Sequence, residues 1–113
     1  MAVVIISFFQ EKSDNFDWTL NSGKTNTLNT GPSIDHSTQT GKGYYLYTET
    51  SFTRPGWKAS LLSPKFKYRT DKCANLWYHM YGKDIGKLEI SLVTGRTSKL
   101  LWSSSGKCND LML

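Results

Sequence analysis

Closely spaced turn signals are the feature of this sequence that most constrains its fold. Glycine and proline favour tight turns, because glycine accepts positive φ angles and proline fixes φ. No long stretch of the chain repeats apolar residues at helical spacing. The spacing therefore predicts an antiparallel all-β fold, either a sandwich or a barrel. The turn signals lie at Asn21–Gly23, Gly31–Pro32, Gly41–Gly43, Arg54–Gly56, Gly82–Lys83, Gly95–Arg96 and Ser105–Gly106.

Short aromatic and branched runs between these turns are the strand candidates. Leu88, Ile90 and Leu92 alternate with polar residues, which is typical of a half-buried strand. Residues 44–50 and 74–81 are further extended candidates. The apolar run 2–6 predicts a buried strand rather than a secretory signal, since it has neither a basic segment nor a small-residue cleavage site. The residues expected in the core are Trp18, Leu61, Leu76, Tyr78, Leu88, Ile90 and Trp102.

Composition narrows the class of protein further. The 113 residues fit a single domain, and 38% hydrophobic with 20% charged residues allow a core and argue against disorder. The formal net charge of +5 permits contact with acidic partners without requiring it. Two cysteines are too few for a disulfide scaffold. No apolar run reaches transmembrane length, so direct insertion into a membrane is not expected.

The stretch Asp35-His36-Ser37 contains the residue types of a hydrolase triad at the wrong spacing. Neighbouring side chains on a strand point to opposite faces, so these three cannot share one proton path. The stretch Gly41-Lys42-Gly43 lacks the spacing of a phosphate-binding loop. These patterns therefore predict no catalysis.

A second set of catalytic residue types occurs at Cys73, Asn75 and His79. On one strand Cys73 and His79 would lie about 20 Å apart, far beyond hydrogen-bond reach. The chain has two histidines and neither an HExxH nor a CxxC motif, so a zinc site is not expected.

A basic stretch interleaves cations with aromatic residues at positions 65–72. On a strand the aromatics would face inward and the cations would face water, and this solvated-face interpretation is favoured. The alternative is a binding patch for an acidic glycan, an acidic protein surface or a nucleic acid. The cations concerned are Lys65, Lys67, Arg69 and Lys72.

Several short motifs follow one another in a specific order along the chain. They are Asp14–Trp18, Gly31-Pro32 with Asp35-His36-Ser37, Gly43–Ser51, Ala59 with Leu61–Pro64, Cys73 with Leu76–Gly82, Gly86 with Leu88, and Leu101-Trp102 with Gly106. Each is weak alone, but together they resemble the MAM domain. This extracellular module is named after meprin, a neuropilin-type antigen and receptor tyrosine phosphatase mu.

The resemblance implies a jelly-roll-like antiparallel β-sandwich, formed by residues 1–113 as a single domain. It also implies a place outside the cell, in a larger membrane-associated or secreted protein, and a non-catalytic role in adhesion or protein interaction. Other proteins, including further copies of the chain, are the expected partners. The alternative is binding of an acidic or heparin-like glycan, with Trp57, Trp77, Trp102 or the tyrosines as stacking platforms. Nucleic-acid binding is supported by charge alone and is not expected.

The resemblance gives Asp35-His36-Ser37 a structural role, in which hydrogen bonds position a loop before the tyrosine-rich strand. Some family members hold a cation with oxygen ligands, which makes Asp35 a weak candidate for a structural calcium or sodium ion. Hard cations require several oxygens, so a single aspartate is not a complete site, and no other cofactor is expected. The matching positions assigned structural roles are Trp18, Pro32, His36, Cys73, Trp77, Tyr78, Gly82 and Trp102.

The chain also departs from the family pattern. Val3–Phe9 contains no cysteine where the family has one, and the family's closing strand has no recognisable counterpart after Gly106. Cys73 matches a family cysteine whose partner lies on that strand, whereas Cys108 has no family counterpart. We therefore expect two unpaired thiols rather than a Cys73–Cys108 disulfide. We also expect a shortened domain, marginally stable or self-associating when isolated.

Overall fold

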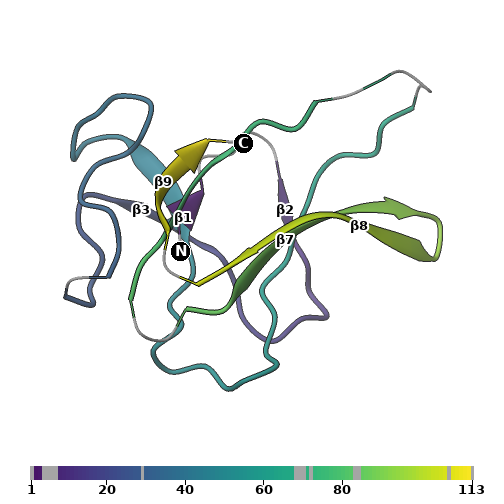
Figure 1. The fold of residues 1–113 in the computed structure, drawn as a ribbon, viewed down its shortest axis with the longest axis horizontal. Coiled ribbons are helices and arrows are strands. Elements are labelled where there is room, and N and C mark those ends of the chain that lie inside the picture. Colours follow the sequence, from purple (N-terminus) through teal and green to yellow (C-terminus); the bar gives the residue numbers. More distant parts are fainter. Residues whose placement is uncertain are drawn as a thin grey trace.

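The computed structural model describes residues 2–3, 8–28, 30–67, 71, 73–82, 85–106 and 108–112, and side chains only between residues 8 and 106. The described residues form strands and turns without a helix, and paired strands are antiparallel (Figure 1). This confirms the predicted class. The strands are β1 (Ala2–Val3), β2 (Phe9–Gln10), β3 (Thr19–Ser22), β4 (Tyr44–Tyr47), β5 (Leu61–Leu62), β6 (Trp77–Met80), β7 (Lys87–Thr94), β8 (Thr97–Ser105) and β9 (Cys108–Met112).

Five strands form the larger sheet, in the order β3-β4-β1-β6-β9. The strand β1 lies between β4 and β6, with Ala2 opposite Tyr47 on one side and opposite His79 on the other. This confirms a strand at the start of the predicted run 2–6, whose residues 4–6 lie outside the described part of the chain. At one edge of the sheet, β9 pairs with β6 and forms a five-residue strand after Gly106.

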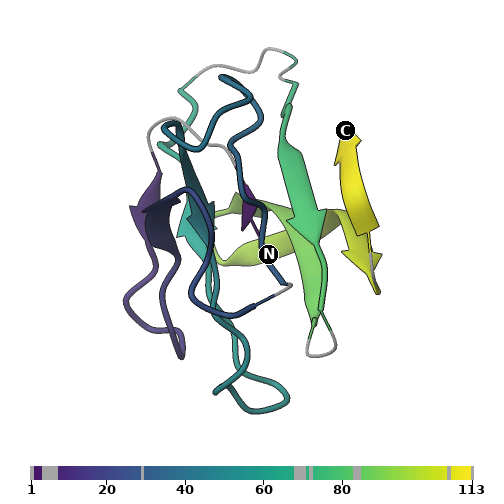
Figure 2. The ribbon, with the colours of Figure 1, turned by 90° about the vertical axis from the view of Figure 1, so that its left-hand side faces the viewer.

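Two further pairs of strands, β2–β5 and β7–β8, complete the described sheets. The strands β7 and β8 form a long hairpin that passes behind the five-stranded sheet in Figure 2 and projects outward in Figure 1. Ile90 pairs with Trp102 but Ser91 pairs with Leu100, so Leu101 is an extra residue in β8. Such a β-bulge bends the strand and increases its twist.

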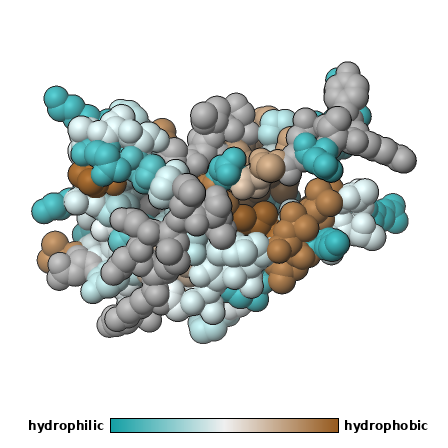
Figure 3. Space-filling view, turned by 45° about the horizontal axis from the view of Figure 1, so that its top comes forward, coloured by the Kyte–Doolittle hydropathy of each residue, from teal (hydrophilic) through white to brown (hydrophobic). Residues whose placement is uncertain are grey.

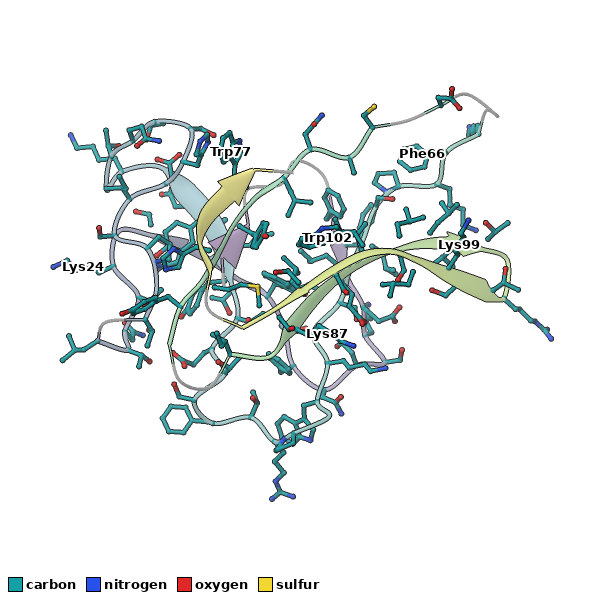
Figure 4. All side chains as sticks on the ribbon, viewed as in Figure 1. Lys24, Phe66, Trp77, Lys87, Lys99 and Trp102 are labelled. Atoms are coloured by element: carbon teal, nitrogen blue, oxygen red, sulfur yellow. The ribbon has the colours of Figure 1, made fainter. Side chains whose placement is uncertain are left out.

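The core lies between the large sheet and the strand pairs beside it. Trp18, Tyr78 and Met80 are buried at its centre, and the Trp18 indole Nε1–H donates to the Ala59 carbonyl oxygen at 3.0 Å. Tyr78 meets Trp102 of the hairpin edge to face, with ring centroids 5.3 Å apart, and Trp102 points into the molecule in Figure 4. The partly buried residues packed around this centre are Leu46, Ala59, Leu61, Leu76, Leu88 and Trp102.

The predicted core is confirmed at its centre and only partly at its rim. Trp18 and Tyr78 are buried as expected, whereas Ile90 and the other predicted core residues keep part of their surface in water. Met80, absent from the prediction, is fully buried at 0% exposure. It shares a face of β6 with Tyr78, because side chains two residues apart on a strand point the same way.

Candidate interaction surface

The Asp35 carboxylate is held inside its own loop. Asp35 is buried, and its oxygens accept hydrogen bonds from the Thr38 backbone amide at 2.9 Å and from the Thr38 hydroxyl. The Asp35 amide donates to the Thr40 carbonyl oxygen at 3.1 Å, which closes the loop. A β-carbon at position 43 would overlap the carboxylate, so Gly43 is required where the loop meets β4. The Thr38 hydroxyl, and then the Thr38 amide, hold the pKa of Asp35 below its ordinary value.

The neighbours of Asp35 point elsewhere. The His36 ring stacks on the Trp77 indole, with centroids 3.4 Å apart and planes inclined by 15°, and Ser37 is exposed. Trp77 lies beside this loop at the start of β6 (Figure 4). The side chains at positions 35–37 therefore form no proton path, and their contacts support a structural role for the loop.

Tyr45 extends this polar network beneath the loop. Its buried hydroxyl donates to the Gly23 carbonyl oxygen at 2.5 Å and lies 3.2 Å from the Pro32 carbonyl oxygen. The same hydroxyl accepts a hydrogen bond from the Asn21 side-chain amide at 2.7 Å. Burial raises the pKa of the Tyr45 hydroxyl, so it stays protonated and can donate at neutral pH. Tyr45 thus ties two segments to β4: the end of β3 with the turn after it, and the loop at Pro32.

The cation considered for Asp35 from the sequence stays a prediction. No three His, Cys, Asp or Glu side chains among them are grouped so that they could hold a metal ion. Both Asp35 oxygens already accept hydrogen bonds from Thr38. A hard cation requires several oxygen ligands, so the Asp35 carboxylate alone is not a complete site.

A shallow hollow is lined by residues 10–12 and 14–17, and several of its polar side chains form hydrogen bonds within the protein. The Asp14 carboxylate accepts a hydrogen bond from the Ser60 amide at 2.5 Å, and the Glu11 carboxylate accepts one from the Ser13 hydroxyl at 3.0 Å. The Gln10 side chain is likewise engaged at both ends with the Trp18 backbone. These polar groups hold the chain entering β3 and point to no ligand.

The described part of the basic stretch does not form the predicted strand with inward-facing aromatics and outward-facing cations. Residues 63–67 form no strand, and Phe66 is 62% exposed between the exposed side chains of Lys65 and Lys67. Figure 4 places Phe66 on an outer loop of the molecule. The prediction that the aromatic faces inward is therefore wrong at this position. Two further predicted cations, Arg69 and Lys72, lie outside the described residues.

Two other positions with predicted structural roles lie at the ends of β6. Cys73 is exposed just before the strand. The side chain of Cys108 lies outside the described residues, so the pairing of the two thiols stays a prediction. Gly82 follows the strand with a φ of 127°.

The outer half of the β7–β8 hairpin carries apolar side chains in water. Four such residues, which we call the hairpin apolar surface, are between 48% and 59% exposed; they are Leu92, Val93, Leu100 and Leu101. A band of hydrophobic surface lies just inside the hydrophilic hairpin tip in Figure 3. The sequence contained a signal for it, because adjacent apolar residues at 92–93 and 100–101 place apolar groups on both faces of a ribbon. At most one face can cover the core.

Comparisons with known proteins agree with the motif order. A family model described as MAM domain, meprin/A5/mu, matches residues 5–110. Human MAM domain-containing glycosylphosphatidylinositol anchor protein 2 is 44% identical over 90% of this chain and 12% of its own length. Chicken MAM domain-containing glycosylphosphatidylinositol anchor protein 1 is 43% identical over 95% of this chain and 12% of its own length. Human MAM domain-containing protein 2 is 40% identical over 89% of this chain and 15% of its own length.

The matched region covers most of this chain but only a small part of each relative. No solved structure matches significantly. Within the described residues, no helix is long and apolar enough to cross a membrane. The family model spans nearly the whole sequence, and the relatives are similar along the same length. The chain therefore belongs to the MAM domain family.

Proposed function

We propose that this domain acts outside the cell as a non-catalytic module that binds a protein partner through the hairpin apolar surface. The setting is supported by relatives whose names describe glycosylphosphatidylinositol anchor proteins, since such anchors hold proteins at the cell surface. The binding role is supported by the apolar side chains on the projecting hairpin. Further copies of this chain are included among the candidate partners.

The exposed apolar groups carry this proposal. Scattered apolar residues are ordinary on protein surfaces, but a contiguous apolar patch usually marks an interaction site. Leu92, Val93, Leu100 and Leu101 lie on two paired strands within a few residues of one another. Leu100 pairs with Ser91, which lies two residues from Val93 along β7, so Leu100 and Val93 share one face of the ribbon. A partner covering that face removes apolar area from water.

The test uses a double variant, Val93→Thr with Leu100→Thr. Threonine is β-branched and favoured in strands, and it replaces apolar surface with a smaller side chain that bears a hydroxyl. The matched control is Leu20→Thr with Leu28→Thr, which changes two exposed apolar residues elsewhere on the molecule. Beads coated with each form of the domain are mixed with one another and with cultured cells, with and without protease treatment of the cell surface.

We expect the hairpin variant to lower cell binding or bead clustering at least about fivefold, which corresponds to about 1 kcal/mol of binding free energy. The control variant should stay within about twofold of the parent domain. Protease treatment should remove the cell-binding signal. Equal binding by parent and hairpin variant, or binding that survives protease treatment, contradicts a protein contact at this surface.

A further inference from the structure

A second exposed surface lies on the loop Thr50–Lys58, which is the teal segment at the lower end of Figures 1 and 2. Its backbone is fixed by two consecutive turns. The Thr53 amide donates to the Thr50 carbonyl oxygen at 3.2 Å, and the Trp57 amide donates to the Arg54 carbonyl oxygen at 3.0 Å. The second turn has proline at its second position and Gly56, with a φ of 90°, at its third, which is the pattern of a type II turn.

The base of the loop is also tied to another segment. The Lys58 amide donates to the Asn15 side-chain oxygen at 2.9 Å, and the Asn15 amide donates to the Lys58 carbonyl oxygen at 2.9 Å. The Ser60 amide donates to the Asp14 carboxylate at 2.5 Å. A loop held in this way loses little conformational entropy when it binds a ligand.

The side chains on this fixed loop are open to solvent. Phe52 is 87% exposed and Trp57 is 43% exposed. The other three tryptophans are more buried: Trp18 lies in the core, Trp77 is stacked on His36, and Trp102 contacts Tyr78. Trp57 is therefore the tryptophan whose ring surface is most available for a ligand.

The loop is cationic and contains no acid. Arg54 and Lys58 are exposed, and positions 50–58 include three hydroxyl residues but neither aspartate nor glutamate. The carboxylate of Glu49, which precedes the loop, accepts hydrogen bonds from the Thr27 hydroxyl at 2.6 Å and from the Ser51 amide at 3.1 Å. Charge complementarity therefore favours an anionic ligand.

The spacing of the aromatic residues favours a sugar over a protein partner. Phe52 and Trp57 are separated by the four residues Thr53–Gly56, which include one cation and no large apolar side chain, whereas the hairpin carries adjacent apolar residues. A pyranose ring presents an apolar C–H face to one aromatic ring, with polar groups around its rim. A guanidinium matches the geometry of a carboxylate or sulfate group with two parallel hydrogen bonds.

We propose that the Thr50–Lys58 loop binds an anionic saccharide, one bearing uronic acid or sulfate groups. Trp57 and Phe52 stack on sugar rings, and Arg54 pairs with the carboxylate or sulfate. This inference is independent of the proposed protein contact, because it concerns a different surface. The hairpin double variant should therefore keep its saccharide binding.

The test is isothermal titration of the folded domain with three octasaccharides. Heparin fragments carry sulfate and carboxylate groups, hyaluronan fragments carry carboxylates alone, and maltooctaose is neutral. The variants are Arg54→Gln, Trp57→Ala and Phe52→Ser. Their matched controls are Arg96→Gln, an equal charge change at the exposed hairpin tip, and Phe66→Ser, an equal change at another exposed phenylalanine.

We expect binding of at least one anionic octasaccharide and none of maltooctaose, and the anionic arms distinguish sulfate from carboxylate recognition. Arg54→Gln and Trp57→Ala should each weaken binding about tenfold, and Phe52→Ser about threefold, while both controls stay within about twofold. Because Phe52 is 87% exposed, Phe52→Ser should leave the fold intact. This variant therefore tests the proposal even if Trp57→Ala unfolds. Circular dichroism checks folding of each variant.

Three results overturn the proposal. The first is an absence of binding to either anionic saccharide. The second is an equal loss in Arg54→Gln and Arg96→Gln, which indicates attraction by net charge alone. The third is retained saccharide binding in Phe52→Ser and Arg54→Gln together with lost binding to protease-sensitive cell-surface sites, which assigns the loop to a protein partner instead.

Discussion

The inner face of β6 and the outer half of the β7–β8 hairpin carry similar apolar patterns with opposite outcomes. Tyr78 and Met80 alternate with polar or half-buried neighbours and are buried. Leu88 and Leu92 also alternate along β7, but Leu88 packs against the core and Leu92 stays 48% exposed. Along β7, the side chains become exposed to water beyond the register shift between Ile90 and Ser91.

Alternation along a strand determines which side chains share a face, but not whether another layer of the protein covers that face. β6 is flanked by strands on both sides and faced by Trp18. Beyond the bulge, the described residues place no third strand beside β7 and β8. Apolar burial therefore depends on distant elements, and the two regions should respond to mutation in different ways.

The largest contrast is expected between truncations in the two regions. Met80→Ala should lower the free energy of unfolding by about 2–5 kcal/mol, because it leaves a cavity in a fully buried position. Leu100→Ala, at an exposed position, should cost less than about 1 kcal/mol. Chemical denaturation of both variants measures the difference. Similar losses would show that the hairpin is packed as tightly as the sheet.

A smaller contrast concerns two neighbouring tyrosines of β4. Tyr45→Phe removes the hydroxyl that donates to Gly23 and accepts from Asn21, and should cost about 1–3 kcal/mol. Tyr44→Phe changes an exposed neighbour and should be nearly neutral. Thermal and chemical unfolding of the pair test whether the polar network beneath the loop contributes to stability. If Tyr45→Phe left the free energy of unfolding unchanged, the hydroxyl's hydrogen bonds would not contribute to stability.

The Asp35 loop should make stability depend on pH. The hydrogen bonds from Thr38 lower the pKa of Asp35 in the folded state, so the unfolded state binds its proton more tightly. The stabilisation is therefore present above the unfolded pKa and is lost as pH falls below about 4. Unfolding midpoints between neutral and acidic pH should fall less steeply for Asp35→Asn than for the parent chain. Parallel pH profiles would mean that the loop contacts do not favour the carboxylate.

The smallest effect is expected at the base of the hairpin. The Lys87 ammonium and the Glu89 carboxylate lie 2.5 Å apart, but both side chains are exposed, at 57% and 42%. Exposed ion pairs contribute little, so Glu89→Gln should change the free energy of unfolding by less than about 1 kcal/mol. Added salt should reduce the difference further. A larger or salt-insensitive loss would indicate that Glu89 has another structural partner.

Local chemistry made the strand class and several turns predictable, whereas the partners of each strand were not. Turn residues act within a few positions, and Gly56 and Gly95 do adopt positive φ. The placement of β1 between β4 and β6 depends on contacts about 45 and 75 residues away along the sequence. Local patterns do not contain this information.

The candidate surfaces show the same division. Alternation at 65–69 predicted a strand, but β5 ends at Leu62 because its partner β2 has two residues and Pro64 offers no N–H for pairing. Phe66 is therefore left exposed. The spacing alone predicted that Asp35, His36 and Ser37 do not form a catalytic set. This prediction depends only on local geometry, because adjacent side chains point in different directions.

The position of β1 and β9 on either side of β6 also sets the response of the domain to mechanical tension. Both strands are antiparallel to β6 and therefore run parallel to each other. A pull on the first residue of β1 and the last residue of β9 acts along the strands in opposite directions. The hydrogen bonds on both sides of β6 are then sheared together rather than opened one after another. In the proposed role at a cell surface, this geometry would resist stretching, because the hydrogen bonds on both sides of β6 would have to break together.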